Sequence, residues 1–443
     1  MGRRLWRPFA ILAATLMVPA CGSHYHPMAG PIHLSPASLS FIGSIAGPNP
    51  PSQEVQLTNL GGFIPRRTLS ILTWTASSDK PWLKYTPEFG TTGAGTDLFT
   101  ISVVPQQSEA WTMDTNLTGA PAAGAEDFSM VWTGSEILIW GGAVASGPTL
   151  SNVGYRYDPT ANAWIGTLSM VGAPSPRWGH TAIWTGKEMI VWGGSDSSGT
   201  RLNDGYRYDP ATDTWSGPIS TTSAPEARRA HTAVWTSTEM IVWGGEVAGL
   251  PVNTGARYNP KTDIWSPVTM IGAPAIRWHH AAVWTGTEMI VWGGFDGVNG
   301  IDTGMRYSPS TDTWGAVTST LGTPPGRLTT STIWTGSEMI VFGGQATQGS
   351  PGSNTGGRYD PLADSWNPTT TINAPTSRYG HAGVWTGNEM IIWGGAPSFQ
   401  NTGKHYLPQI ALTVGVYAAS FAVSDPRAAN SPQHVDVSYQ VTP

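Results

Sequence analysis

The chain has 443 residues with a net charge of -6, so it lacks the basic surface that binding to a nucleic-acid backbone requires, and no nucleic acid is expected as a partner. Only 12% of the residues are charged, whereas Gly occurs 54 times, Pro 36 times and Trp 22 times. Low charge combined with many turn-forming and aromatic residues predicts an all-β fold of many short strands.

The first 20 residues predict a signal peptide, because three arginines precede a short apolar run from Phe9 to Val18. The stretch LMVPAC resembles a bacterial lipoprotein cleavage box and ends in Cys21, the only cysteine. We therefore expect lipidation at Cys21, a tether over residues 21–31, and an exported protein held by its lipid at the outer membrane or cell surface. A periplasmic or secreted protein with an incidental cysteine is the alternative. A single cysteine permits no intrachain disulfide.

Residues 32–107 contain strand-like segments such as LSPASLSF, EVQLTNLGG and LFTISVVPQ. With Trp74 and the PWL at Trp82, they resemble the first part of a BACON domain, a small immunoglobulin-like β-sandwich of surface proteins. The Gly-x-Tyr strand and the valine-rich strand that end such domains occur only at the far end of the chain, from Gly415. The resemblance implies one sandwich formed by residues 32–107 and 409–443 and interrupted between them. Two unrelated β segments are the alternative.

Between these flanks a unit of about 50 residues recurs six times, with its tryptophan-threonine pair at Trp132, Trp184, Trp235, Trp284, Trp334 and Trp385. The second unit shows four strand-like pieces: HTAIW, EMIVW before a Gly-Gly pair, GYRYDP, and the segment from Trp215. The Gly-Gly pair, the Tyr of RYDP and the following Trp resemble kelch repeats like those in the central domain of galactose oxidase. The resemblance covers residues 108–408 and implies a six-bladed β-propeller with four strands in each blade.

The fourth strand follows only five of the six units, at Trp164, Trp215, Trp265, Trp314 and Trp366. A matching sequence, EAWTMDTNLTGAP, stands before the first unit and contains Trp111. We predict that residues 109–117 supply the last strand of the sixth blade, beside Tyr406. Such a closure removes the free edges of the ring.

Candidate ligand-binding residues precede the first strand of each unit, on one face of the predicted propeller. Five arginines share the position seven residues before the WT tryptophan, where the first unit has Ala125: they are Arg177, Arg228, Arg277, Arg327 and Arg378. A resemblance to peptide-binding kelch adaptors implies that such arginines hold carboxylate or phosphate groups. Alternatively, each arginine bonds backbone carbonyls or a neighbouring blade.

The next positions differ between units, which favours a role in recognition. They hold Trp178, Arg229, Trp278, Leu328 and Tyr379, with Glu126 and Asp127 in the first unit. Aromatic residues there could stack on sugar rings, or they could pack between blades. His180, His231, His280 and His381 are predicted to pack between blades rather than to bind metal. The arginines of the Arg-Tyr pairs (RY arginines) and the glutamates before the second strand (EMI glutamates) are predicted to pair within blades as scaffold. The RY arginines are Arg156, Arg207, Arg257, Arg306 and Arg358, and the EMI glutamates run from Glu136 to Glu389. Neither metal nor cofactor is expected.

These patterns predict a monomeric, exported binding protein that recognises an extracytoplasmic glycan, acidic peptide or protein. An enzyme is less favoured. Galactose oxidase-like chemistry needs a cysteine crosslinked to a tyrosine, and the sole cysteine lies at the end of the signal sequence. A sialic-acid mutarotase-like activity needs neither metal nor nucleophile and would recruit Glu126, Asp127, Arg228 and Arg229. A structural surface spacer that binds no ligand is a third possibility.

Overall fold

The computed structural model describes residues 32–44, 52–59, 72–78, 83–87, 89–92, 96–103, 106–107, 109–121, 124–144, 149–408, 410–411, 415–424 and 431–442. Every regular element in these ranges is a β-strand, which confirms the all-β prediction. The predicted signal peptide, Cys21, the tether and Trp82 lie outside them. No helix in the described ranges is long and apolar enough to cross a membrane.

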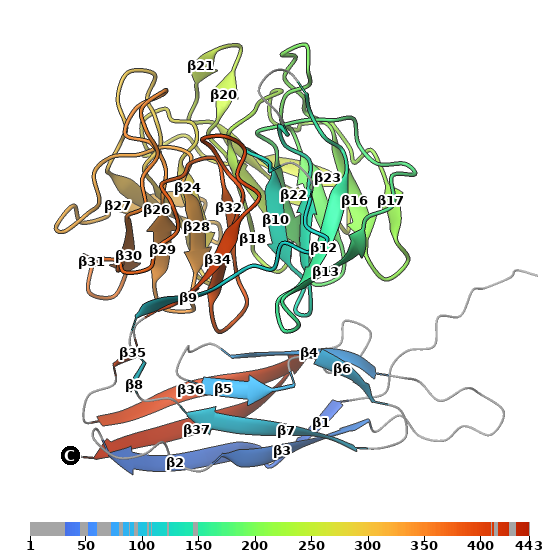
Figure 1. Ribbon diagram of the computed structural model, residues 1–443, viewed down its shortest axis with the longest axis vertical. Helices are drawn as coiled ribbons and strands as arrows, with labels where there is room; N and C mark the ends of the chain where they lie inside the picture. Colours follow the sequence, from blue (N-terminus) through green and yellow to red (C-terminus); the bar gives the residue numbers. More distant parts are fainter. Residues whose placement is uncertain are drawn as a thin grey trace, which may run out of the picture.

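Most of the strands form four-stranded antiparallel sheets, of which the described residues contain six in the repeat region (Figure 1). The first three are β10 (Ser129–Trp132), β11 (Ile137–Trp140), β12 (Gly154–Asp158) and β13 (Ala163–Thr167); β14 (Thr181–Trp184), β15 (Met189–Trp192), β16 (Gly205–Asp209) and β17 (Thr214–Ser216); and β18 (Thr232–Trp235), β19 (Met240–Trp243), β22 (Gly255–Asn259) and β23 (Ile264–Pro267). The fourth and fifth are β24 (Ala281–Trp284), β25 (Met289–Trp292), β26 (Gly304–Ser308) and β27 (Thr313–Val317); and β28 (Ser331–Trp334), β29 (Met339–Phe342), β30 (Gly356–Asp360) and β31 (Ser365–Pro368).

The sixth sheet joins distant parts of the chain: β32 (Ala382–Trp385), β33 (Met390–Trp393), β34 (Gly403–Leu407) and β9 (Ala110–Asp114). In it Trp111 lies opposite Tyr406, with their ring centroids 4.8 Å apart. The first strands of successive sheets contact one another around a circle, and β10 also contacts β32. The six sheets therefore form a closed ring, which we call the repeat ring.

The second strand of each sheet is the most buried, because it lies between the first and third strands of its own sheet and between two neighbouring sheets. All four residues are buried in each of these strands, from β11 to β33. They read as continuous apolar runs, such as the Met-Ile-Val-Trp of β15, rather than as an alternating pattern, which is expected for a strand covered on both faces.

Two sets of hydrogen bonds fasten each sheet to the next. The Nε1 of the fourth-strand Trp donates to a carbonyl oxygen in the tail of the preceding sheet at 2.8–3.2 Å; the donors are Trp164, Trp215, Trp265, Trp314, Trp366 and Trp111. A carboxylate or amide two residues before each Trp accepts from a Tyr hydroxyl and from a backbone amide of the preceding tail, as Asp213 does. In the sixth sheet Glu109 does so for Tyr406 and Thr370. The closing strand thus repeats the bonding of the other five.

The histidines provide another fastening between sheets. His180, His231 and His280 each bond, at 2.7–3.0 Å, the hydroxyl of Ser129, Thr181 or Thr232 in the preceding sheet. Two units lack this histidine. The fifth unit has Thr330 instead, and the sheet before it has Ala281 in place of the hydroxyl residue. The first unit has Phe128 instead, and the sheet before it in the ring has Ala382. The paired loss of both partners indicates a scaffold role for these three histidines. His381 is buried too, but neither of its ring nitrogens nor the Ser331 hydroxyl bonds a described residue.

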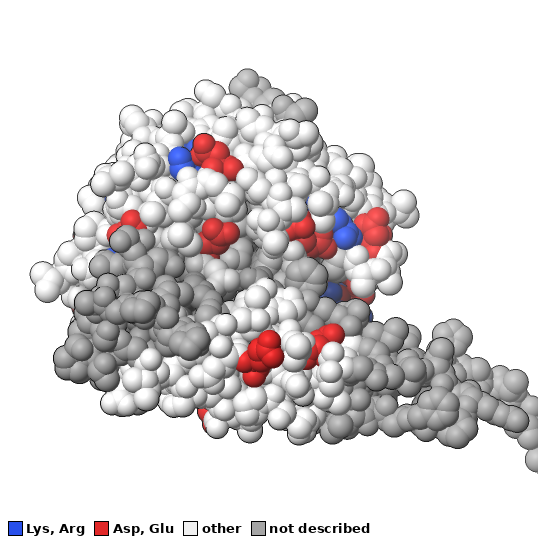
Figure 2. Space-filling view, turned by 60° about the horizontal axis from the view of Figure 1, so that its bottom comes forward, with Lys and Arg blue, Asp and Glu red and all other residues white. Residues whose placement is uncertain are grey.

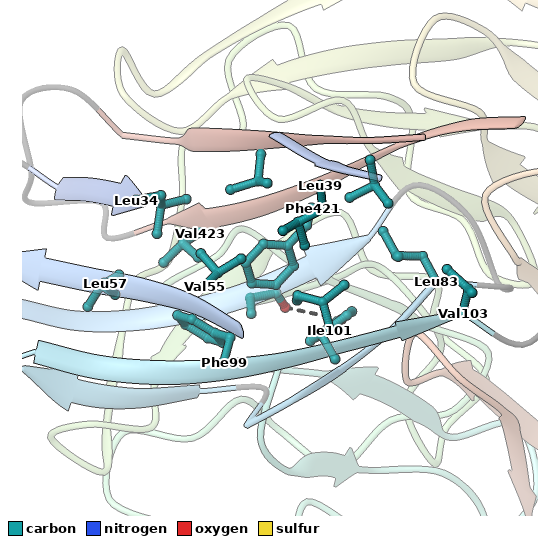
Figure 3. Close-up of a cluster of buried hydrophobic side chains, with 14 of the residues drawn as sticks. Leu34, Leu39, Val55, Leu57, Leu83, Phe99, Ile101, Val103, Phe421 and Val423 are labelled. Atoms are coloured by element: carbon teal, nitrogen blue, oxygen red, sulfur yellow. Dashed lines mark hydrogen bonds between the residues drawn. The ribbon is translucent and has the colours of Figure 1, made fainter. Parts of the chain in front are cut away.

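Strands from both ends of the chain form a second unit, which we call the terminal unit. One sheet has the order β1 (Ile32–Ser35), β3 (Gln53–Asn59), β7 (Thr96–Val103) and β5 (Leu83–Thr86). The other has the order β2 (Ser38–Ser44), β37 (Gln433–Thr442), β36 (Gly415–Ser424), β4 (Leu72–Ser78) and β6 (Phe89–Thr92). The two sheets share one apolar core (Figure 3), in which Phe421 from the C-terminal end packs against Phe99 with ring centroids 5.0 Å apart.

A short strand pair, β8 (Gln106–Gln107) with β35 (Ile410–Ala411), connects the terminal unit to the repeat ring. In Figure 1 the terminal unit lies below the ring, whereas β20 (Glu246–Val247) and β21 (Leu250–Pro251) lie at the top. Figure 2 brings the lower side forward: among its described residues the charged side chains are scattered and mostly acidic. Because β20 and β21 lie at the top of the ring in Figure 1, their loops belong to the face of the ring away from the terminal unit, which we call the far face.

Candidate functional site

The candidate site surrounds the axis of the repeat ring on this far face, where the chain enters each first strand. Six residues there form a closed circle of backbone hydrogen bonds of 2.7–3.1 Å, in which the amide of each residue donates to the carbonyl of its neighbour. They are Asp127, Gly179, Ala230, His279, Thr329 and Gly380, and their φ angles all lie between 50° and 62°. The six amides and six carbonyls satisfy one another, so the circle holds the backbone in a fixed arrangement around the axis.

A polar cavity of about 150 Å³ opens at this circle. Its lining includes Asp127, His279 and Thr329, while glycine or alanine holds the other three positions of the circle. Gly380 leaves room for its neighbour, since a Cβ there would lie 3.2 Å from Oδ1 of Asp127. Because Asp127 belongs to the first unit and His279 to the fourth, a carboxylate and an imidazole enter the cavity from opposite sides of the axis.

The five arginines predicted to bind ligand do not enter this cavity. They are only 0–6% exposed, and each donates from Nη1 to the carbonyl of the first Gly of its own Gly-Gly pair at 2.9–3.1 Å. A second acceptor lies just before the third strand; it is Asp204 for Arg177 and Thr254 for Arg228. The structure therefore places these arginines in the scaffold, as the alternative to ligand binding expected, and we omit them from the candidate site.

The positions that differ between units do meet at the mouth of the cavity. The guanidinium of Arg229 stacks on Trp178, with its carbon 4.2 Å from the ring centroid, and lies 5.7 Å from the Trp278 ring centroid on the other side. Its Nε donates to Oε2 of Glu246 at 2.5 Å, and neither Nη atom bonds any described residue. The two tryptophans thus hold a cation whose two amino groups remain available.

Glu246 is the ion-pair partner of this arginine. Its side chain, in β20, is fully buried. It accepts a hydrogen bond from Arg229, and both of its carboxylate oxygens accept hydrogen bonds from Arg201 at 2.7–3.1 Å. Burial by itself would raise the pKa of Glu246, but hydrogen bonds from Arg201 and Arg229 hold it below the usual value. Two arginines therefore share one carboxylate, which leaves this side of the mouth with a net positive charge.

The opposite part of the mouth is acidic. Burial and then the neighbouring Asp127 raise the pKa of Glu126 to about 7. Burial raises the pKa of Asp127 to about 6, although the charge of Arg229 opposes that rise. Tyr379 lies beside them, and burial followed by these two carboxylates raises its pKa. Near neutral pH this side gains or loses negative charge, whereas the Arg229 side remains positive.

Two of the variable residues have mainly packing roles. Leu328 is buried in a cluster with Ala230, Trp278 and Phe295, so Trp278 presents one ring face to Arg229 and packs its other atoms inside.

The described residues contain no group of three metal-ligating side chains that could hold an ion. Burial lowers the pKa of His180 to about 3, so this histidine is neutral.

The RY arginines, predicted to pair within blades, also bond the neighbouring blade. Arg156 does bond Glu136 of its own sheet at 3.2 Å, but it also donates to the Tyr208 hydroxyl and the Pro210 carbonyl of the next sheet. In the sixth sheet His405 takes the place of this arginine and contacts Tyr157 of the first. These residues join sheets as well as stabilise them.

Sequence reasoning missed Glu246, Arg201 and His279 as members of the site. Glu246 follows the Gly-Gly pair, where the other units have Ala143, Ser195, Phe295, Gln345 or Ala396, so only the third unit has a charge at this position. The same comparison between units that selected Arg229 would have selected Glu246. Antiparallel bridges join the two residues, as they join each equivalent pair in the other sheets.

Comparison with known proteins shows what these repeats are similar to. Residues 127–344 match the family model described as the KLHDC2/KLHL20/DRC7 Kelch-repeats domain. Among curated proteins, the chain is 32% identical over 110 residues to the Rab9 effector protein with kelch motifs of Xenopus laevis (24% of this chain, 30% of that protein) and 30% identical over 118 residues to Kelch domain-containing protein 3 of Homo sapiens (26% and 31%). The matches span less than a third of each of these relatives. The repeat region of this chain therefore has a kelch-repeat fold.

Proposed function

We propose that the chain is an exported binding protein that captures an acidic segment of a partner protein at the mouth of the axial cavity. In this proposal the repeat ring is a six-bladed kelch propeller inserted in a BACON-like, immunoglobulin-type sandwich, and a lipid on Cys21 holds it at the cell surface. Kelch repeats generally mediate protein–protein interactions, which favours a protein ligand over a glycan. The axial mouth supplies the site.

The observation that carries the proposal is the state of Arg229. Its guanidinium is fixed by Trp178, Trp278 and Glu246, so little side-chain entropy is lost when a ligand binds. Its two free amino groups match the paired oxygens of a carboxylate, and such paired bonds are among the stronger hydrogen bonds in proteins. Because Arg201 shares Glu246, the positive charge of Arg229 is not fully neutralised within the protein.

A peptide array or display library read against the purified full chain tests the proposal. We expect selection of segments rich in Asp and Glu, and at least a tenfold loss of affinity in the Arg229→Gln variant. Lys187→Gln is the matched control, because it also removes one positive charge, but from an exposed turn. Affinity for acidic peptides that is unchanged in Arg229→Gln, or binding of neutral glycans with no peptide selected, would show the proposal to be wrong.

A further inference from the structure

The first unit differs from the other five at the position of the scaffold arginine, and a cavity lies at that place. Ala125 replaces the arginine, and Val153 stands where the other units have an Asp or Thr that accepts from it: Asp204 through its carboxylate, and Thr254, Thr303, Thr355 and Thr402 through their backbone carbonyls. The arginine and the polar side chain at the acceptor position are therefore absent together, whereas the backbone carbonyl of that position remains. No larger apolar residue fills the space that the arginine side chain occupies in the other units.

The resulting cavity has a volume of about 280 Å³ and lies between the first and sixth sheets. Its walls are mainly apolar and include Ala125, Ile139, Val153 and Trp393. Tyr155 and Ser151, which are half-buried, line it as well. Apolar cavities of about 150 Å³ in proteins already accept molecules the size of benzene, so this one has room for a larger ring.

One polar group in the wall is left without its usual partner. In the other units the carbonyl of the first Gly of the Gly-Gly pair accepts a bond from the scaffold arginine, for example Gly193 from Arg177 at 3.1 Å. The equivalent carbonyl belongs to Gly141, which lines the cavity, and no described residue donates to it. A buried carbonyl oxygen without a donor is unfavourable, so a ligand that donates to it gains a bond at little cost.

We propose that this cavity is a binding site for a small neutral molecule or side chain that combines an apolar ring or branched alkyl group with one N–H or O–H donor. The apolar part would fill the space left by the missing arginine, and the donor would bond the Gly141 carbonyl. A cationic ligand is disfavoured, because the walls are mainly apolar and Val153 lacks the carboxylate that Asp204 offers to Arg177 in the second unit. The site is separate from the axial mouth and does not depend on the function proposed for it.

A fluorine NMR titration of the full chain with fluoroindole tests this proposal. We expect saturable binding at one site, several-fold tighter than that of fluoroindene, which has a similar shape but no N–H donor. The double variant Ala125→Arg/Val153→Thr restores the pair found in four of the other units and is expected to abolish binding. Ala125→Leu fills the same space without a charge and should also abolish it, in case the restored arginine prevents folding.

Arg327→Ala/Thr355→Val is the matched control, because it removes the same pair from the fifth sheet and should create a second site for the probe. Failure of the native chain to bind fluoroindole would overturn the proposal. So would binding that persists unchanged in both Ala125 variants, since the probe would then lie elsewhere. Equal affinities for fluoroindole and fluoroindene would overturn the role of the Gly141 carbonyl.

Discussion

Single residues decide which parts of the repeat ring serve recognition and which serve packing. Arg228 and Arg229 are adjacent, yet the first is 1% exposed and bonded to the Gly244 and Thr254 carbonyls, while the second reaches the axial mouth. Sequence position alone could not separate them, because the direction of a side chain before a strand depends on the local backbone. Variation between units did separate them: Arg228 repeats in five units and Arg229 occurs once.

The two carboxylates at the mouth predict a pH dependence of acidic-peptide binding. Their pKa values of about 7 and about 6 lie above the usual range, so both are largely neutral at pH 5 and add negative charge as the pH rises to 8. A peptide carboxylate remains charged over this whole range. Affinity should therefore fall several-fold from pH 5 to pH 8, as measured by calorimetry at constant ionic strength.

The variant Glu126→Gln should flatten this pH profile and retain the affinity seen at low pH. The substitution keeps the size of the side chain and removes the group with the higher pKa. Affinity that rises with pH, or a profile that Glu126→Gln leaves unchanged, would contradict the assignment of these carboxylates to the binding site.

Among the elements, β9 is the one whose role depends most on distant sequence. Its role could be predicted because the strand pieces can be counted: five units have a fourth strand, and the sixth copy stands before the first unit. Its detailed bonding could not be predicted. Glu109 stands where the other units have Asp or Asn, and its longer side chain still reaches Tyr406 and the Thr370 amide.

Replacing Trp111 with Ala should destabilise the repeat ring by about 3–5 kcal/mol, the usual cost of removing a large buried aromatic side chain. Trp111 is 3% exposed, packs between Phe342 and Tyr406, and donates to the Thr370 carbonyl. Trp265→Ala is the control, because that residue is equally buried in the third sheet. In chemical denaturation both variants should lose similar stability; an unaffected Trp111→Ala protein beside a destabilised Trp265→Ala protein would contradict the closure.

At the scale of the whole molecule, the terminal unit uses strands from both ends of the chain, and the repeat ring lies between them in sequence. Phe421 and Val423 from β36 enter the same core as Val55 and Phe99 (Figure 3). Gln107 and Ile410 are direct neighbours in the β8–β35 pair. A large segment can therefore leave and re-enter the terminal unit at nearly one point, an arrangement that chains tolerate well.

This arrangement predicts that the terminal unit folds without the ring. Replacing residues 108–409 with a short Asn-Gly turn should leave a cooperative β-sheet protein, because two residues suffice to join neighbouring antiparallel strands. Dispersed methyl resonances and a single thermal transition would show it. A shortened chain that remains unfolded would mean that the terminal unit depends on the ring, which it approaches closely where the Tyr85 hydroxyl lies near Gly387.

The pairing of Trp111 with Tyr406 also sets the order of events when the chain is made. The first five sheets use only neighbouring segments and can form as each emerges from the ribosome, since domains fold from the N-terminal end during synthesis. β9, β2 and one edge of β4, whose other edge pairs with β6, must wait for residues that are made last, and these backbone edges are uncovered in the meantime. The last strands to be synthesised therefore complete both units, so a chain that stops short of residue 403 leaves two incomplete sheets open to aggregation.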